Sequence, residues 1–517
     1  MLSHFAKPFV TRARLNTPVS GIRSISSLSL IKNQNLIHTG AFINGEFVHN
    51  DGKFDVTNPF DLSLLAEVTD TTLNQVQDAI DISQKTFRTF SRDTTPRTRS
   101  TILSKFYNLM MENMEDLAKL ITLENGKPLA DARGEIKYAA SFLQWFSEEA
   151  PRINGDLIPS ANAANRILAL RLPIGPVGIL TPWNFPSAMI TRKLGAAFAA
   201  GCTTVIKPAS ETPLSSLALC QLAREAGVPA GVLNVVPVSN KSTPIVGKMF
   251  CESPMLKKVS FTGSTRVGKI LMKESASTVK KLSFELGGNA PFIVFSDVKD
   301  IDKAVDGLIN SKFRSSGQTC ICTNRIFVQD EIYDEFYHKL VAKLIKSIKL
   351  GNGMDKSVTH GPLIHAKALE KVQFQIQDAV SNGAKIAYGG HALPELGPFF
   401  HELTVLIDVT ADMDIFHNET FGPIAPLIRF RTTEEVIHLA NSTNVGLAGY
   451  LYSSDISKIF DVGERLEVGM VGANTGLISE AALPFGGVKE SGFGREGFKY
   501  GINEYTVVKS IVLNVKN

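Results

Sequence analysis

Cys320 is the first residue whose surroundings suggest chemistry. It lies in the polar run SGQTCICTNR, residues 316–325. Gly317 is three residues before it, and Arg314 and Arg325 are close in sequence. A nucleophilic cysteine needs thiolate character, which nearby positive charge favours. This loop therefore predicts a thiol nucleophile.

Glu285 and Asn184 are two further candidates. Glu285 lies in FELGGN, residues 284–289, where apolar neighbours and glycines would raise the pKa of its carboxyl group toward use as a general base. Asn184 lies in TPWNFP, residues 181–186, a rigid turn, and an asparagine N–H can donate to an oxyanion. Each also has an ordinary explanation, because buried acids are usually paired and buried amides usually bind backbone groups.

A third motif suggests a nucleotide. The run GSTRVG, residues 263–268, follows the strand-like residues Lys258–Phe261, and glycine there would let a pyrophosphate approach the N-terminus of the next helix. Lys207, just before Pro208, could reach a ribose or phosphate. A plain strand-to-helix turn and a solvated lysine are the alternatives.

These motifs lie within alternating strands and helices that begin near residue 175. Such repetition predicts a parallel, doubly wound sheet that binds a nucleotide at its strand ends, and a second series begins after Gly287–Gly288. Two α/β domains are therefore expected to meet there. The expected strands are Val177–Leu180, Cys202–Ile206, Leu233–Val236, Val259–Phe261, Phe292–Phe295 and Arg325–Val328, and the expected helices are Met189–Ala200, one from Pro213 to Gly227, one from Ser264, and Ile301–Phe313.

Composition narrows the class of protein. The chain has 517 residues, 44% of them hydrophobic, and a formal net charge of +4. This indicates a globular protein of two or three domains and gives little support for nucleic-acid binding. The longest uncharged apolar stretch, Leu194–Ile206, falls short of the ~18–20 residues of a membrane span, so no membrane association is expected.

The N-terminus carries much of the excess positive charge. Residues 1–36 contain five Lys or Arg residues, six serines and no Asp or Glu. This composition is typical of a mitochondrial transit peptide, so residues 1–36 are excluded from the fold and a location in the mitochondrial matrix is expected. A flexible basic tail that carries no targeting signal is the alternative.

The five cysteines do not indicate a disulfide framework. Cys320 and Cys322 form a Cys-x-Cys pair, but no Cys or His lies nearby in sequence to complete a zinc site. No metal is expected.

Five motifs together resemble the aldehyde dehydrogenase superfamily. TPWNFP, FTGSTRVG, FELGGNAP, GQTC and ETFGP occur in the order and approximate spacing of that family and cover nearly all of residues 40–517. PSAMITRKLGAA, GQTCICTNR, NTGLIS and PFGGVKESGFGREG are similar to the branch that oxidises succinate semialdehyde to succinate, a step of GABA degradation.

The resemblance implies a mechanism. Cys320 would attack the aldehyde, and the oxyanion of the thiohemiacetal would be held by the Asn184 side chain and the Cys320 backbone N–H. Hydride transfer to NAD or NADP would leave a thioester, which water activated by Glu285 would hydrolyse. Splitting the reaction in this way gives two accessible steps.

The resemblance also assigns ligand contacts. The implied cofactor-binding residues are Trp183, Lys207, Ser210, Gly263, Ser264, Glu419 and Phe421. The implied partners of the substrate carboxylate are Arg192, Arg314 and Ser479. Either arginine could instead form an interdomain salt bridge.

Three positions qualify this assignment. Many members of the family carry Glu where this chain has Ser210, so NADP should be tolerated and could be preferred, although Glu211 keeps NAD possible. Ser315 stands where Asn is frequent, close to the nucleophile. Cys322 could form a reversible disulfide with Cys320, as relatives sharing the pair suggest, or could be a passive loop residue.

The fold implied by the resemblance has two Rossmann-like α/β domains and a small β element for oligomerisation. Residues 37–150 and 175–286 would form the NAD(P)-binding domain, residues 287–485 the catalytic domain, and residues 151–174 and 486–517 the oligomerisation element. The strand-like stretches Arg166–Leu172 and Val507–Val515 would pair within that element, giving a homodimer or homotetramer. Oxidation of glutarate semialdehyde or of a broad range of aldehydes, and a non-catalytic nucleotide-binding relative, are the alternatives.

Overall fold

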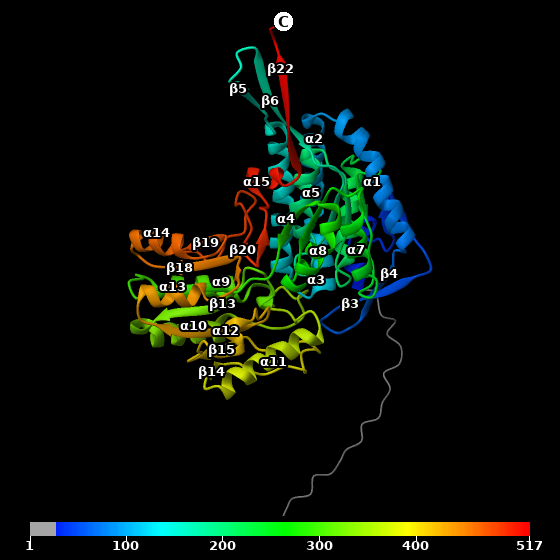
Figure 1. The fold of residues 1–517 in the computed structure, drawn as a ribbon. Coiled ribbons are helices and arrows are strands. Elements are labelled where there is room, and N and C mark those ends of the chain that lie inside the picture. The colour runs from blue at the N-terminus through cyan, green and yellow to red at the C-terminus, as the bar shows by residue number, and fades with distance from the viewer. Residues whose placement is uncertain (1–26, 517) are drawn as a thin grey trace, which may run out of the picture.

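The computed structural model describes residues 27–516, and its largest sheet has eight strands (Figure 1). Five of them are parallel, in the order β9-β8-β7-β10-β11. The order reverses at β7, as in doubly wound nucleotide-binding sheets. Their bounds are β7 Val177–Leu180, β8 Thr204–Lys207, β9 Leu233–Val235, β10 Lys258–Thr262 and β11 Lys281–Glu285; the antiparallel edges are β1 Ala41–Ile43 and β2 Glu46–Val48 on one side and β21 Gly492–Phe493 on the other.

The second sheet has seven strands, six of them parallel in the order β15-β16-β13-β12-β18-β19. The chain passes from the first sheet to the second between Glu285 and Ala290. The two doubly wound sheets confirm the predicted fold class. The bounds are β12 Ala290–Val294, β13 Thr323–Gln329, β14 Lys385–Tyr388, β15 Thr404–Ile407, β16 Ile424–Phe430, β18 Ala448–Tyr452 and β19 Met470–Ala473.

Helices cover both faces of the first sheet because its strands are apolar on both sides. Val177 and Ile179 enter a core shared with α4, α5 and α6, whereas Leu180 enters a second core with α7 and α8. Within residues 27–516, none of the helices combines the length and apolar character needed to cross a membrane. The helices are α1 Leu73–Asp93, α2 Pro96–Glu112, α3 Met114–Asn125, α4 Leu129–Glu149, α5 Ala188–Ala200, α6 Pro213–Glu225, α7 Thr243–Glu252, α8 Thr265–Ser275, α9 Ile301–Lys312, α10 Tyr333–Ser347, α11 Ala366–Ser381, α12 Asp414–His417, α13 Thr433–Asn441, α14 Ile456–Arg465 and α15 Phe498–Asn503.

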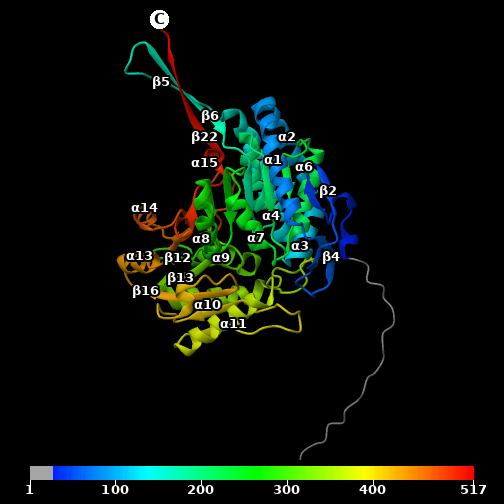
Figure 2. The same cartoon turned by 45° about the vertical axis from the view of Figure 1, so that its right-hand side comes forward.

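A three-stranded sheet projects from the body of the molecule in both views (Figures 1 and 2). It consists of β5 (Asp156–Pro159), β6 (Asn165–Pro173) and β22 (Thr506–Asn514), in the order β22-β6-β5. Val508 and Val512 of β22 are 63% and 58% exposed. An exposed apolar strand of this kind is available for pairing with another chain.

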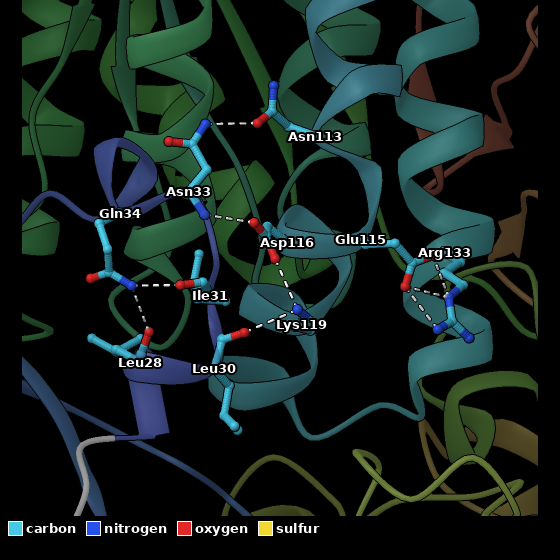
Figure 3. A network of polar contacts seen from close by, with 10 residues as sticks. All are labelled: Leu28, Leu30, Ile31, Asn33, Gln34, Asn113, Glu115, Asp116, Lys119 and Arg133. Atoms are coloured by element: carbon cyan, nitrogen blue, oxygen red, sulfur yellow. Dashed lines mark hydrogen bonds and ion pairs between the residues drawn. The ribbon is translucent and has the colours of Figure 1, made fainter.

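Residues 27–36 pack against the first domain (Figure 3). Ile31 and Leu36 are each 1% exposed. The Asn33 N–H donates to Asp116 Oδ2 at 2.8 Å, and Lys119 Nζ donates to the Leu30 carbonyl at 2.9 Å. The predicted leader boundary at residue 36 thus falls inside the folded body, and the rest of that leader, residues 1–26, lies outside the described residues.

Candidate active site

Cys320 lies at the end of a strained loop. Ser315, Ser316 and Gly317 have φ values of 48°, 54° and 79°, in the left-handed region. Gly288 passes so close that a Cβ there would collide with the Cys320 carbonyl oxygen. Burial raises the pKa of the Cys320 thiol to about 12, although the charge of Arg192 opposes that shift.

Asn184 faces the same loop from the turn before α5. Its side chain is buried, and its Nδ2 donates to the Gln318 carbonyl at 3.0 Å. A primary amide has two N–H groups, so the second can serve a ligand. The turn therefore presents a fixed donor beside the candidate nucleophile.

Glu285 ends β11 and is 3% exposed. Among the described residues, its Oε2 atom has no hydrogen-bond partner. Burial, together with the nearby Glu496 carboxylate, raises the pKa of Glu285 well above its ordinary value. Such a group can accept a proton near neutral pH.

These three side chains line one cavity of about 390 Å³, which also receives most of the predicted cofactor residues. Ser264 caps the N-terminus of α8 there, and its Oγ accepts from Val267 N at 3.4 Å. The cavity is lined by Pro182, Trp183, Asn184, Met189, Thr262, Gly263, Ser264, Glu285, Leu286, Gly287, Cys320, His365, Lys367, Ala368, Lys371, Glu419, Thr420 and Phe421.

Glu419 and Phe421 form a further part of the cavity wall. Glu419 Oε1 accepts from the Gly288 N–H at 3.1 Å, and burial raises the pKa of Glu419 to about 7. The Phe421 ring meets Trp183 edge to face, with ring centres 5.6 Å apart. This wall combines a hydrogen-bond acceptor for hydroxyl groups with flat apolar surface.

A second cavity, of about 220 Å³, contains Ser210 and Glu211. Glu211 accepts from Ser210 Oγ at 3.2 Å and from Asn240 Nδ2 at 3.3 Å. These two hydrogen bonds fix the position of its carboxylate. Lys207 ends β8 in the same region, and burial lowers the pKa of its ammonium group to about 8. Nearly all residues that line this second cavity belong to the first domain, as does the loop of Ser264. One extended ligand could therefore contact both along that domain.

The residues predicted to hold the substrate carboxylate fall into two groups. Arg314 and Ser479 line a small cavity together with Thr319 and Tyr450. Arg192 is 1% exposed and is ion-paired with Glu496. Its Nη2 atom nevertheless has no hydrogen-bond partner within residues 27–516.

Tyr138 and Glu496 are two neighbours of this site that the sequence did not reveal. The Tyr138 hydroxyl is buried, and burial raises its pKa, although the nearby cations of Arg192 and Arg314 oppose that shift. Glu496 pairs with Lys193 as well as Arg192. Tyr138 lies in none of the motifs quoted above, and Glu496 lies in PFGGVKESGFGREG, residues 484–497, which gave it no role of its own.

Cys322 lies beside the nucleophile but is enclosed. It is 1% exposed, its Sγ is 2.5 Å from Thr319 Oγ1, and both Cys320 and Cys322 are free thiols. The reversible disulfide between them stays a prediction.

Known proteins match nearly the whole chain. The model of the aldehyde dehydrogenase family matches residues 47–511. Succinate-semialdehyde dehydrogenase NADP(+) 1 of Schizosaccharomyces pombe is 54% identical over 476 residues, covering 92% of this chain and 95% of that protein. The mitochondrial succinate-semialdehyde dehydrogenase of Homo sapiens is 50% identical, covering 92% and 88%. A crystal structure of succinate-semialdehyde dehydrogenase from Burkholderia pseudomallei is similar with a TM-score of 0.91 at 49% identity, covering 94% and 100%.

Proposed function

The chain belongs to the aldehyde dehydrogenase family, and we propose that it oxidises succinate semialdehyde to succinate with NADP or NAD as hydride acceptor. The observation that carries the proposal is the convergence of a thiol, an amide and a carboxylate on one cavity, those of Cys320, Asn184 and Glu285. Within residues 27–516 the Oε2 atom of that carboxylate has no hydrogen-bond partner. Relatives at 54% and 50% identity are named for this activity.

Cys320 supplies the nucleophile. Its sulfur forms a bond to the aldehyde carbon, and the carbonyl oxygen becomes the oxyanion of a thiohemiacetal. The free N–H of the Asn184 amide and the Cys320 backbone N–H are available to that oxyanion. Because burial raises the pKa of the thiol to about 12, the sulfur must lose its proton to a base as it reacts. Solvent water reaches the partly exposed Cys320 and takes this proton, so Glu285 stays ionised for the hydrolysis step.

Glu285 completes the reaction by activating the water that hydrolyses the thioester. A bound nicotinamide supplies the hydride acceptor, and loss of hydride leaves a thioester on Cys320. Glu285 then removes a proton from water, whose oxygen attacks the thioester carbon, and the C–S bond breaks to release the acid. The free Oε2 atom of Glu285 is the proton acceptor that this step needs.

The cavities fit an extended dinucleotide. Gly263 and the α8 N-terminus suit a pyrophosphate, because both border the main cavity and a helix N-terminus attracts anions. Glu419 would hold the nicotinamide ribose, Phe421 would pack nearby, and Lys207 would bind the adenosine ribose. Ser210 places a short, uncharged side chain where many members of the family carry Glu, which favours use of NADP. Glu211 also lines this cavity, and its carboxylate is hydrogen-bonded to Ser210 and Asn240.

The distal carboxylate of the substrate would be held by Arg192, Arg314 and Ser479. A carboxylate cannot be buried unpaired without a large cost in free energy, and Arg192 has a buried Nη2 donor still unpartnered in the described structure. Arg314 and Ser479 share a cavity wall. These donors account for selection of a semialdehyde over a neutral aldehyde.

The activity is tested by formation of reduced cofactor from a panel of aldehydes. Succinate semialdehyde should give the highest kcat/KM, above glutarate semialdehyde and butanal, with NADP used at least as well as NAD. A higher kcat/KM for glutarate semialdehyde would make that aldehyde the preferred substrate. Equal kcat/KM values for all three aldehydes would refute the carboxylate pocket. A strong preference for NAD would refute the role given to Ser210.

The full-length chain is proposed to act in the mitochondrial matrix as a homodimer or homotetramer. Residues 1–36 contain no acidic residue, and the human relative is named mitochondrial. The exposed apolar face of β22 favours assembly. A fusion of residues 1–40 to a fluorescent protein should enter mitochondria, and sedimentation of the purified protein should show no monomer; a cytosolic fusion or a monomeric protein would refute the respective statement.

A further inference from the structure

We propose that one face of α4 sets the position of the Asn184 amide relative to the Cys320 loop, through the carboxylates of Glu135 and Asp131. The two acids are four residues apart, which places them one turn apart on the same face of the helix. The inference rests on the oxyanion role given to Asn184 in the proposed function.

Glu135 is tied to the Asn184 turn through a buried ion pair. Its Oε2 accepts from Lys127 Nζ at 2.7 Å, and the two side chains are 0% and 1% exposed. The same Nζ donates to the backbone carbonyl of Asn184 at 2.5 Å and lies 3.9 Å from the centre of the Phe185 ring. Lys127 therefore binds the main chain of the oxyanion residue itself.

The other oxygen of Glu135 caps the helix that follows this turn. Oε1 accepts from the backbone N–H of Ser187 at 2.9 Å and of Ala188 at 3.4 Å. Ser187, at the N-terminus of α5, makes no side-chain capping hydrogen bond of its own. A carboxylate there satisfies free N–H groups and interacts favourably with the helix dipole. One carboxylate thus fixes the turn around Asn184 from both sides.

Asp131 holds the loop that carries the nucleophile. Its Oδ2 accepts from the Ser315 N–H at 3.0 Å. Ser315 and Ser316 adopt left-handed backbone conformations that are uncommon for residues other than glycine and asparagine. The bond from Asp131 therefore anchors a strained segment five residues before Cys320.

The two loops meet at the bond from Asn184 Nδ2 to the Gln318 carbonyl, 3.0 Å long. Glu135 and Asp131 of α4 are bonded to both loops, Glu135 on the Asn184 side and Asp131 on the Cys320 side. The two carboxylates therefore set the distance between the oxyanion donor and the attacking sulfur. A displacement of ~1 Å in a catalytic group can cost ~100-fold in rate. Glu135 and Asp131 are thus positioning residues.

Glu135→Gln tests this with little change of shape, because the amide oxygen can still accept from Ser187 while the charge facing Lys127 is lost. The variant should lower kcat by about 10–100-fold, with KM for aldehyde and for NADP within about twofold. The same change at Glu148, an exposed residue of α4, is the matched control and should leave kcat unchanged.

A double-mutant cycle separates positioning from general structural support. In an Asn184→Ala background, Glu135→Gln should change kcat by less than about twofold, because the group it positions is already gone. The same fold loss in both backgrounds, or an unchanged kcat for Glu135→Gln alone, would overturn the inference. Native kcat in Asn184→Ala alone would overturn the oxyanion role and the inference with it, whereas a large loss there leaves the proposed function standing whatever Glu135→Gln does.

Asp131→Asn gives a second measurement should Glu135→Gln fold poorly. Because Asp131 acts on the nucleophile's loop, its variant should change the rate of Cys320 alkylation by iodoacetamide by about threefold or more and lower kcat. Glu148→Gln should alkylate at the native rate. Native alkylation and native kcat in Asp131→Asn would exclude the α4 face as the positioning element.

Discussion

The guanidinium of Arg192 forms a buried ion pair with Glu496, which lies in the segment before α15. Glu496 also pairs with Lys193, the next residue of α5. Although burial disfavours its charge, this pairing raises the pKa of Arg192 above its ordinary value, so the side chain remains cationic beside Cys320 and Glu285. The two readings of Arg192, salt bridge and substrate ligand, are therefore compatible.

Arg314→Gln should raise KM for succinate semialdehyde by about 10–100-fold, because a hydrogen bond to a charged group contributes ~1.5–3 kcal/mol. Butanal has the same chain length without the carboxylate, and its KM should change by less than about twofold. Initial-rate kinetics on both aldehydes provide the comparison. An equal change in KM for both aldehydes would show that Arg314 does not bind the substrate carboxylate.

Arg192→Gln should raise KM in the same selective way and should also destabilise the protein. Removing one partner of a buried ion pair typically costs ~3–5 kcal/mol, since the remaining carboxylate of Glu496 loses half of its compensation. Thermal denaturation of Arg192→Gln beside Arg314→Gln measures the difference. A native midpoint in Arg192→Gln would show that the pair does not stabilise the fold.

Thioester hydrolysis should become faster as pH rises through the neutral range. Glu285 acts as a base only when ionised, and burial raises the pKa of its carboxyl group, so the active form accumulates at higher pH. When hydrolysis limits the rate, we expect kcat to rise with pH and to level off once Glu285 is ionised, at a higher pH than an ordinary carboxyl group would require. A flat profile, with hydrolysis shown to be limiting, would contradict this role.

Ser210→Glu should lower kcat/KM for NADP by about 100-fold or more, because a new carboxylate in the second cavity would repel the 2′-phosphate. The value for NAD should change far less. Ser210→Ala, which adds no charge, is the matched control and should keep the native cofactor preference. Equal losses with both cofactors in Ser210→Glu would mean that this position does not face the 2′-hydroxyl.

A variant that begins at Ile37 should have a lower thermal midpoint than one that begins at Ser27. The longer deletion removes the buried side chains of Ile31 and Leu36, each contributing ~1.5–3 kcal/mol, and leaves Asp116 without its bond from Asn33 (Figure 3). Thermal denaturation of both variants measures this. Equal midpoints would show that residues 27–36 add nothing to stability.

Ser315→Asn should raise the free energy of unfolding by about 0.5–1 kcal/mol, because asparagine adopts the left-handed conformation more readily than serine. Ser316→Asn, in the same conformation, should gain less, since the Ser316 hydroxyl already donates to the Gly361 carbonyl at 2.8 Å. Denaturant unfolding of the two variants provides the comparison. A Ser315→Asn protein less stable than the native one would contradict the strain at this position.

The sequence predicted four strands of the first sheet and two of the second, because each of these is a short apolar run bounded by turn residues. Val259–Phe261 lies within β10, and Ile301–Phe313 differs from α9 by one residue at its end. The three predicted catalytic residues and five of the seven predicted cofactor residues line one cavity, and Ser210 lines a second. Local patterns are sufficient here because each element carries its own apolar periodicity.

Long-range contacts could not be predicted in the same way. Glu135 and Tyr138 lie on α4, and nothing in their local sequence shows which loops that helix meets. Glu496 is in the quoted run PFGGVKESGFGREG, but that run does not show that its carboxylate pairs with Arg192 and Lys193. Residues 27–36 share the acid-free composition of the preceding chain, yet Ile31 and Leu36 are buried, because burial depends on a partner surface that composition does not describe.

The central claim is that Cys320 carries the acyl group of succinate semialdehyde until Glu285 activates water. Glu285→Gln, incubated with NADP and succinate semialdehyde, should form about one equivalent of reduced cofactor and then stop. Mass spectrometry should find an adduct of about 100 Da, a succinyl thioester, on the peptide containing Cys320. Continued turnover without an adduct, or an adduct on another residue, would contradict the account.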